Sequence, residues 1–63
     1  MKLIDLQTLC DGDQKVVIEK HDGYCMSVME YTFIKDLEQS TYKDCEIELI
    51  SAGKDYSLWI RLY

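Results

Sequence analysis

The sequence predicts a small α+β domain: a four-stranded antiparallel sheet built from two hairpins, with two short helices, in the order α-β-β-α-β-β. Three patterns in the chain predict this fold. Apolar residues recur at helical spacing in two segments. Four other segments have the β-branched or alternating apolar residues of strands, and turn residues join these four strands into two hairpins. Since the chain has 63 residues and no linker or repeat, we expect a single domain over residues 1–63.

The first segment, residues 2–10, predicts a short amphipathic helix. Its apolar stripe has spacings of three and four residues and consists of Leu3, Leu6, Leu9 and Cys10. The sequence Asp11-Gly12-Asp13 is expected to end this helix, because glycine readily adopts the left-handed conformation that closes helices. A helix this short is marginal in isolation, so we expect it to pack on another element.

Residues 15–20 are rich in β-branched side chains and predict a strand. The following Asp22-Gly23 is typical of a two-residue hairpin loop, which places Ile18 opposite Ser27 and Val17 opposite Val28. In this register His21 and Cys25 point to opposite faces of the sheet. The sequence therefore argues against a Cys–His catalytic pair, whose side chains must lie within hydrogen-bond reach.

Residues 32–39 predict the second helix. Phe33 and Leu37 lie four residues apart, and Ile34 extends the same apolar side. Thr32 is placed to cap the N-terminus of this helix, and Ser40-Thr41 is expected to end it.

The closing hairpin is predicted from two alternating segments joined by a turn at residues 52–55. The register that pairs Leu49 with Leu58 and Ile47 with Ile60 places every aliphatic side chain on one face. The same register places Glu46 opposite Arg61 on the other face. A slip by one residue would scatter this match, so we expect this register to hold.

Composition and motifs exclude several functions. Twelve acidic residues against seven basic ones give a net charge of −5, which disfavours direct nucleic-acid binding, although an acidic nucleic-acid mimic stays an alternative. Three cysteines, no signal peptide and no long apolar run predict reduced thiols, a cytoplasmic location and no membrane association. One histidine and no close cysteine pair predict no metal, and absent catalytic and phosphate-binding motifs predict no cofactor and no enzyme.

The outer face of the predicted sheet carries more large apolar groups than a solvated face should. Trp, Tyr and Arg are enriched at interface hot spots, and exposed apolar patches mark interaction sites. The candidate binding residues are Trp59, Arg61, Tyr63, Ile50, Tyr24 and Val28. We expect a homo-oligomer interface or a site for another protein on this face.

Two alternatives remain for this face. In one, Trp59 merely packs over neighbouring side chains at the edge of the sheet. In the other, Trp59, Arg61 and Tyr63 form an aromatic–guanidinium ladder that stacks a base and holds a phosphate, in an oligomer that sequesters a nucleotide-type ligand.

The order of elements also carries a resemblance. A "KVVI" strand precedes a "DG" hairpin, an "IKDL" segment and a closing "CEIELISAGKDYSLWIRLY" hairpin. This pattern resembles a group of very small uncharacterised proteins from phages and mobile elements of Firmicutes. The resemblance implies a non-enzymatic interaction protein, phage-encoded, that inhibits a host component such as a defence system by stoichiometric binding.

Overall fold

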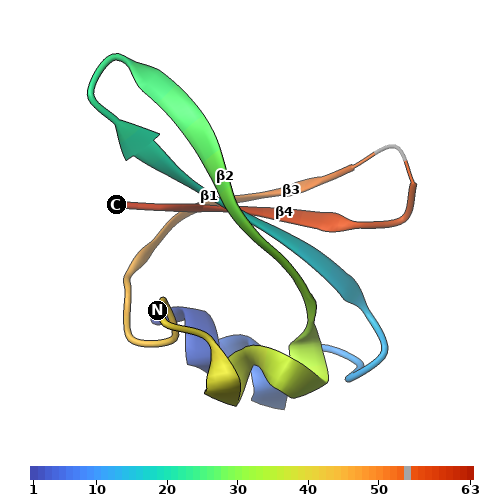
Figure 1. Cartoon of the computed structure of the whole chain (residues 1–63). Coiled ribbons are helices and arrows are strands. Elements are labelled where there is room, and N and C mark those ends of the chain that lie inside the picture. Colours follow the sequence, from blue (N-terminus) through green and yellow to red (C-terminus); the bar gives the residue numbers. More distant parts are fainter. Residues whose placement is uncertain (54) are drawn as a thin grey trace.

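The computed structural model of the chain describes residues 1–53 and 55–63 and consists of four strands and two short 3₁₀ helices (Figure 1). In chain order the elements are η1 (Leu3–Thr8), β1 (Lys15–Asp22), β2 (Cys25–Phe33), η2 (Ile34–Gln39), β3 (Ile47–Ala52) and β4 (Leu58–Leu62). The predicted element order and the two hairpins are confirmed. No helix in these described residues is long and apolar enough to span a bilayer.

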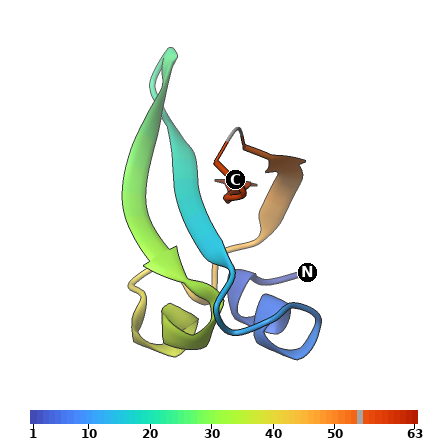
Figure 2. The ribbon, with the colours of Figure 1, turned by 90° about the vertical axis from the view of Figure 1, so that its right-hand side faces the viewer.

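The sheet is mixed, so the prediction of a fully antiparallel sheet is wrong. Its strand order is β2-β1-β4-β3, and the two central strands, β1 and β4, run parallel. Parallel neighbours need a crossover of about a dozen residues or more. Residues 34–46, which include η2, supply that length between the two hairpins. Figure 2 shows the resulting twist, with β4 seen end-on while β1 and β2 run across the view.

The two helices pack side by side against one face of the sheet, as predicted (Figure 2). The core consists of Leu3 and Leu6 from η1, Val16 and Ile18 from β1, Ile34 and Leu37 from η2, and Ile60 and Leu62 from β4. The four strand residues share one face, because Ile18 lies beside Ile60 in the parallel pair and strand side chains alternate.

The buried helical stripes are shorter than predicted because η1 ends before Leu9 and η2 begins after Phe33; within each 3₁₀ helix, residues i and i+3 share a side. Leu3 and Leu6 are buried, but Leu9 lies beyond η1 and is 64% exposed. In η2 the buried pair is Ile34 and Leu37. Phe33 instead ends β2 as an exposed strand residue.

Two predicted helix boundaries are also wrong. Thr32 is a strand residue rather than a cap, since β2 continues to Phe33. The first helix ends at Thr8 and Leu9, in right-handed conformation, is its C-cap, so Gly12 does not close it. Gly12 instead lies against Lys35: its carbonyl accepts the Lys35 N–H at 3.0 Å, and an added Cβ would stand 3.3 Å from the Lys35 Cβ.

The first hairpin has a different loop and register from those predicted. Its two loop residues are Gly23 and Tyr24, and Gly23 takes the positive φ of 67°. A positive φ at the first loop position suits glycine and a type II′ turn. A bulge between Ile18 and Glu19 then shifts the pairing further. Val17 therefore lies opposite Tyr31 instead of Val28.

The closing hairpin also departs from the predicted register. Ile60 pairs with Ile50 instead of Ile47, and Leu49 lies opposite Arg61. The predicted Glu46–Arg61 pair is therefore wrong. Farther from the turn, a register shift between Ile47 and Leu49 places Ile47 opposite Leu62. Alternation of apolar and polar residues predicted the strands correctly. It cannot reveal an extra residue within one strand, after which the side chains point to the opposite faces of the sheet.

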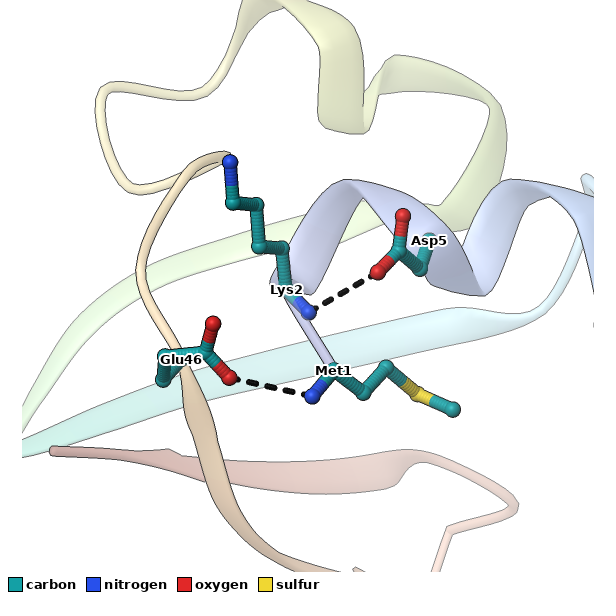
Figure 3. Close-up of polar contacts among 4 residues, drawn as sticks. All are labelled: Met1, Lys2, Asp5 and Glu46. Carbon is teal, nitrogen blue, oxygen red and sulfur yellow. Dashed lines mark hydrogen bonds and ion pairs between the residues drawn. The ribbon is translucent and has the colours of Figure 1, made fainter.

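Glu46 has a different role, at the start of β3 (Figure 3). Its carboxylate accepts a hydrogen bond from the Met1 amine at 3.0 Å, while the Asp5 carboxylate accepts the Lys2 N–H at 2.9 Å. The Ile47 N–H donates to the Met1 carbonyl oxygen at 2.9 Å. The first residues of the chain thus cover the free edge of β3 where that strand begins.

Candidate protein-binding groove

Strand pairing places side chains in rows across the face of the sheet that the helices leave uncovered, here called the outer face. Val17 on β1 lies between Tyr31 on β2 and Trp59 on β4. In the next row towards the start of β1, Lys15 pairs with Phe33. Directly opposed residues share a face, so three aromatic rings surround Val17 on the outer face.

These side chains enclose a groove with a volume of about 540 Å³. We call it the outer groove. Its lining residues are Lys15, Val16, Val17, Tyr31, Thr32, Phe33, Asp36, Asp55, Ser57 and Trp59. The floor at Val17 is only 6% exposed, whereas the Tyr31 wall is 74% exposed. The charged residues at its border are Lys15, Asp36 and Asp55.

Trp59 is held in place from beneath and lines two hollows. An added Cβ on Gly53 would overlap the indole ring, so the ring packs directly on the Gly53 backbone. Trp59 also lines a second hollow of about 370 Å³, together with Glu19 and Ser51. Because β4 is a central strand, Trp59 is not the edge residue that one of the sequence-based alternatives supposed.

The Arg61 guanidinium is engaged by a carboxylate of its own sheet. Arg61 lies beside Glu19 in the parallel β1–β4 pair, and its Nε stands 3.7 Å from the Glu19 Oε1. That nitrogen is buried and has no hydrogen-bond partner among the described residues. A neighbouring carboxylate weakens any attraction of Arg61 for an anion, which disfavours the ladder that would hold a phosphate.

The structure brings together only part of the predicted site. Trp59, Arg61 and Val28 lie on the outer face, the last opposite Glu19. Ile50 does not, because its partner Ile60 points into the core. Tyr24 is fully exposed at the tip of the first hairpin, at the opposite end of β1 and β2 from Lys15 and Phe33.

Tyr63 follows the last residue of β4 and is exposed, and its N–H donates to the Glu46 carbonyl oxygen. Sequence reasoning missed Tyr31, Phe33 and Lys15. The signal for the two aromatics was present, because Tyr31-Thr32-Phe33 continues the alternation of a strand. The assignment of Phe33 to a helix concealed it.

The described residues hold little chemistry elsewhere. No group of three or more His, Cys, Asp or Glu side chains in residues 1–53 and 55–63 is placed to hold a metal ion. The His21 Nε2 stands 3.7 Å from the Glu48 Oε2 at the exposed end of the first hairpin. Cys25 pairs with Asp22, the residue next to His21, so His21 and Cys25 do point to opposite faces. All three cysteines are unpaired.

Comparisons with known proteins add no further assignment: no family model, curated protein or solved structure matches this chain.

Proposed function

We propose that the chain is a non-enzymatic interaction protein that binds another protein through the outer groove. The observation that carries this proposal is the groove itself: an apolar floor between three aromatic side chains, on the face of a sheet that the protein's own helices leave uncovered. Aromatic side chains around a desolvated centre are the usual anchors of protein interfaces.

The shape of the groove favours an inserted side chain from a partner. The wall residues Tyr31 and Phe33 stand on β2 and the floor residue Val17 stands on β1, so strand residues form the centre of the groove. Sites on regular elements are more rigid and lose less entropy on binding. The resemblance to small phage proteins supplies a biological setting, in which the partner is a host component inhibited by stoichiometric binding.

Selection of peptides on the immobilised protein tests this proposal. A random-peptide library is panned on the wild-type chain, and the selected peptides are then measured on two variants, Tyr31→Ser and Tyr24→Ser. Both changes remove an exposed tyrosine ring, but only Tyr31 borders the outer groove. Exposed substitutions of this kind change stability by only about 0.5 kcal/mol, so both variants fold.

We expect the selected peptides to lose at least about tenfold in affinity on Tyr31→Ser, because a hot-spot ring contributes about 1.4 kcal/mol or more. Affinity for Tyr24→Ser stays at the wild-type value. Selected peptides that bind both variants equally well would show that partners dock elsewhere.

A second candidate function is sequestration of a small ligand, and one observation favours it: the volume of the outer groove lies within the range of about 300–1,000 Å³ of ligand pockets. The site would then hold an uncharged or cationic ring rather than a phosphate, because two aspartates and only one lysine border the groove. Mass spectrometry of the freshly purified, denatured protein tests this function. A stoichiometric co-purified molecule supports it, and a clean spectrum from several expression hosts argues against it.

A further inference from the structure

We infer that the free edge of β2 is a self-association surface, at which a second copy of this chain adds its own β2 antiparallel to the first. Two four-stranded sheets would thus join into one sheet of twice the width. This inference concerns the edge of the sheet and stands independently of the proposal that the outer groove on its face binds a partner.

The two edges of the sheet differ in how they are protected. β3 is covered where it begins, because Ile47 donates its N–H to Met1 and Lys2 bridges to Glu46. β2 pairs with β1 only, among the strands in residues 1–53 and 55–63. Its other side leaves backbone N–H and C=O groups without a strand partner over nine residues. Natural sheets blunt such an edge with lysine, proline or a covering segment.

The sequence of β2 lacks most of these protective features. Its nine residues, CMSVMEYTF, contain no lysine, arginine or proline, and one bulge near Met29. Its single charged residue, Glu30, is partly buried and accepts a hydrogen bond from the Ser40 hydroxyl at 3.0 Å. The edge therefore presents no free charge to an approaching strand.

Charge favours a second copy at this edge over other surfaces of the chain. With a net charge of −5, two copies repel each other over most approaches. A strand of nine residues is about 30 Å long, and here it offers the exposed apolar side chains of Val28, Tyr31 and Phe33 with one engaged carboxylate. Electrostatic repulsion between two copies is therefore weakest where their β2 strands meet.

Symmetry also suits this arrangement. Two identical strands pair antiparallel about a two-fold axis, and opposed side chains must share a face. The axis therefore passes midway between the two copies of one residue, and Glu30 meets its own copy only if that residue is Glu30. Every other register avoids a like-charge pair. Because the axis is perpendicular to the sheet, both outer grooves lie on the same side of the dimer, which makes the assembly bivalent.

Size supplies a reason for association. A chain of about 60 residues buries only about 60% of its unfolded surface, so pairing adds burial that one copy lacks. A stable interface buries about 800 Å² on each partner, and the free chain exposes 4310 Å². The required area is thus about a fifth of the surface of one copy.

Two charged substitutions, one on each edge, test the inference. Val28→Lys places a lysine on the β2 edge opposite Glu19, and Leu49→Glu places a glutamate on the β3 edge opposite Arg61. The replaced side chains are similarly exposed, at 41% and 47%. Each new charge faces an opposite charge within its own sheet, so each variant keeps the fold of the single copy. Circular dichroism verifies this for both.

Light scattering coupled to size exclusion, at increasing protein concentration, gives the mass. We expect the wild type and Leu49→Glu to reach twice the 7.4 kDa chain mass, and Val28→Lys to stay at 7.4 kDa. A wild type that stays at 7.4 kDa at every concentration overturns the inference. So does a Val28→Lys variant that still dimerises, or a Leu49→Glu variant that becomes monomeric.

Amide hydrogen exchange is a second readout that does not depend on any substitution. Along an edge strand, alternate amides point away from the sheet and exchange quickly. We expect these β2 amides to become protected in the wild type as concentration rises. Fast exchange of the outward amides at the highest concentration also overturns the inference.

Discussion

Substitution of two leucines three residues apart tests whether the buried stripe of η1 stops at Leu6 or continues, as the sequence predicted, to Leu9. Leu6 is 2% exposed in the core, whereas Leu9 is 64% exposed just beyond η1. The Leu6 carbonyl oxygen accepts hydrogen bonds from the backbone N–H groups of Leu9 and Cys10. Truncation of the Leu6 or the Leu9 side chain leaves these backbone groups unchanged. Leu6→Ala and Leu9→Ala thus make the same chemical change at one buried and one exposed position.

The expected difference in the free energy of unfolding is large. A buried Leu→Ala change removes apolar contacts and leaves a cavity, which costs about 2–5 kcal/mol. A domain of this length has a total stability of about 3–9 kcal/mol. Leu6→Ala therefore removes a large share of the stability and lowers the melting temperature by at least about 8 °C. Leu9→Ala changes stability by no more than about 0.5 kcal/mol.

Urea unfolding is the appropriate assay, followed by far-ultraviolet circular dichroism and by the fluorescence of Trp59, the single tryptophan of the chain. The wild type and Leu9→Ala should share one unfolding midpoint, with Leu6→Ala unfolding at much lower urea. Equal losses for the two variants would refute the reasoning, because they would place both leucines in the core, as the predicted stripe of Leu3, Leu6, Leu9 and Cys10 does.

Three further predictions concern the outer face and the turn beside it. Gly53→Ala displaces the Trp59 ring, which an added Cβ overlaps. We expect a changed Trp59 emission and a loss of about 1–3 kcal/mol, and an unaltered emission would contradict the packing. Tyr56 is exposed and has a positive φ of 63°, a conformation that asparagine tolerates better. Tyr56→Asn should raise stability by about 1 kcal/mol in the same urea assay, and a loss would show that the ring makes a stabilising contact. A double-mutant cycle with Glu19→Gln and Arg61→Met should give a coupling of about 0.5–1 kcal/mol, since the pair is only partly shielded from solvent; additivity would show that the ion pair contributes nothing.

Local patterns predicted the elements but not their arrangement. The Asp-Gly turn and the alternation of Ile60 with Trp59 identified both hairpins, because turn residues and alternation are properties of a short segment. The parallel contact of β1 with β4 joins segments about forty residues apart, and no local pattern records it. The predicted antiparallel sheet and the observed mixed sheet have the same order of elements along the chain, so that order does not distinguish them.

Hairpin registers explain why the site was only partly predicted. In the first hairpin the loop position and the bulge near Met29 place Tyr31 instead of Val28 beside Val17. In the closing hairpin the pairing of Ala52 with Leu58 places Leu49 instead of Ile50 on the outer face. Each shift replaces one apolar residue on the outer face by another apolar residue. The alternation of apolar residues along the sequence is therefore almost the same for either register. The placement of Trp59 and Arg61 on the outer face was predicted correctly, because β4 contains no irregularity.

The central claim is that a protein partner occupies the outer groove, and a nuclear magnetic resonance titration tests it most directly. The labelled wild-type chain is titrated with a peptide selected on it, and the shift of each amide and of the Trp59 indole N–H is followed. The account predicts the largest shifts at Trp59, Tyr31 and Phe33, which surround Val17 in the groove. Shifts that concentrate instead at Tyr24 or on the helices η1 and η2 would contradict it.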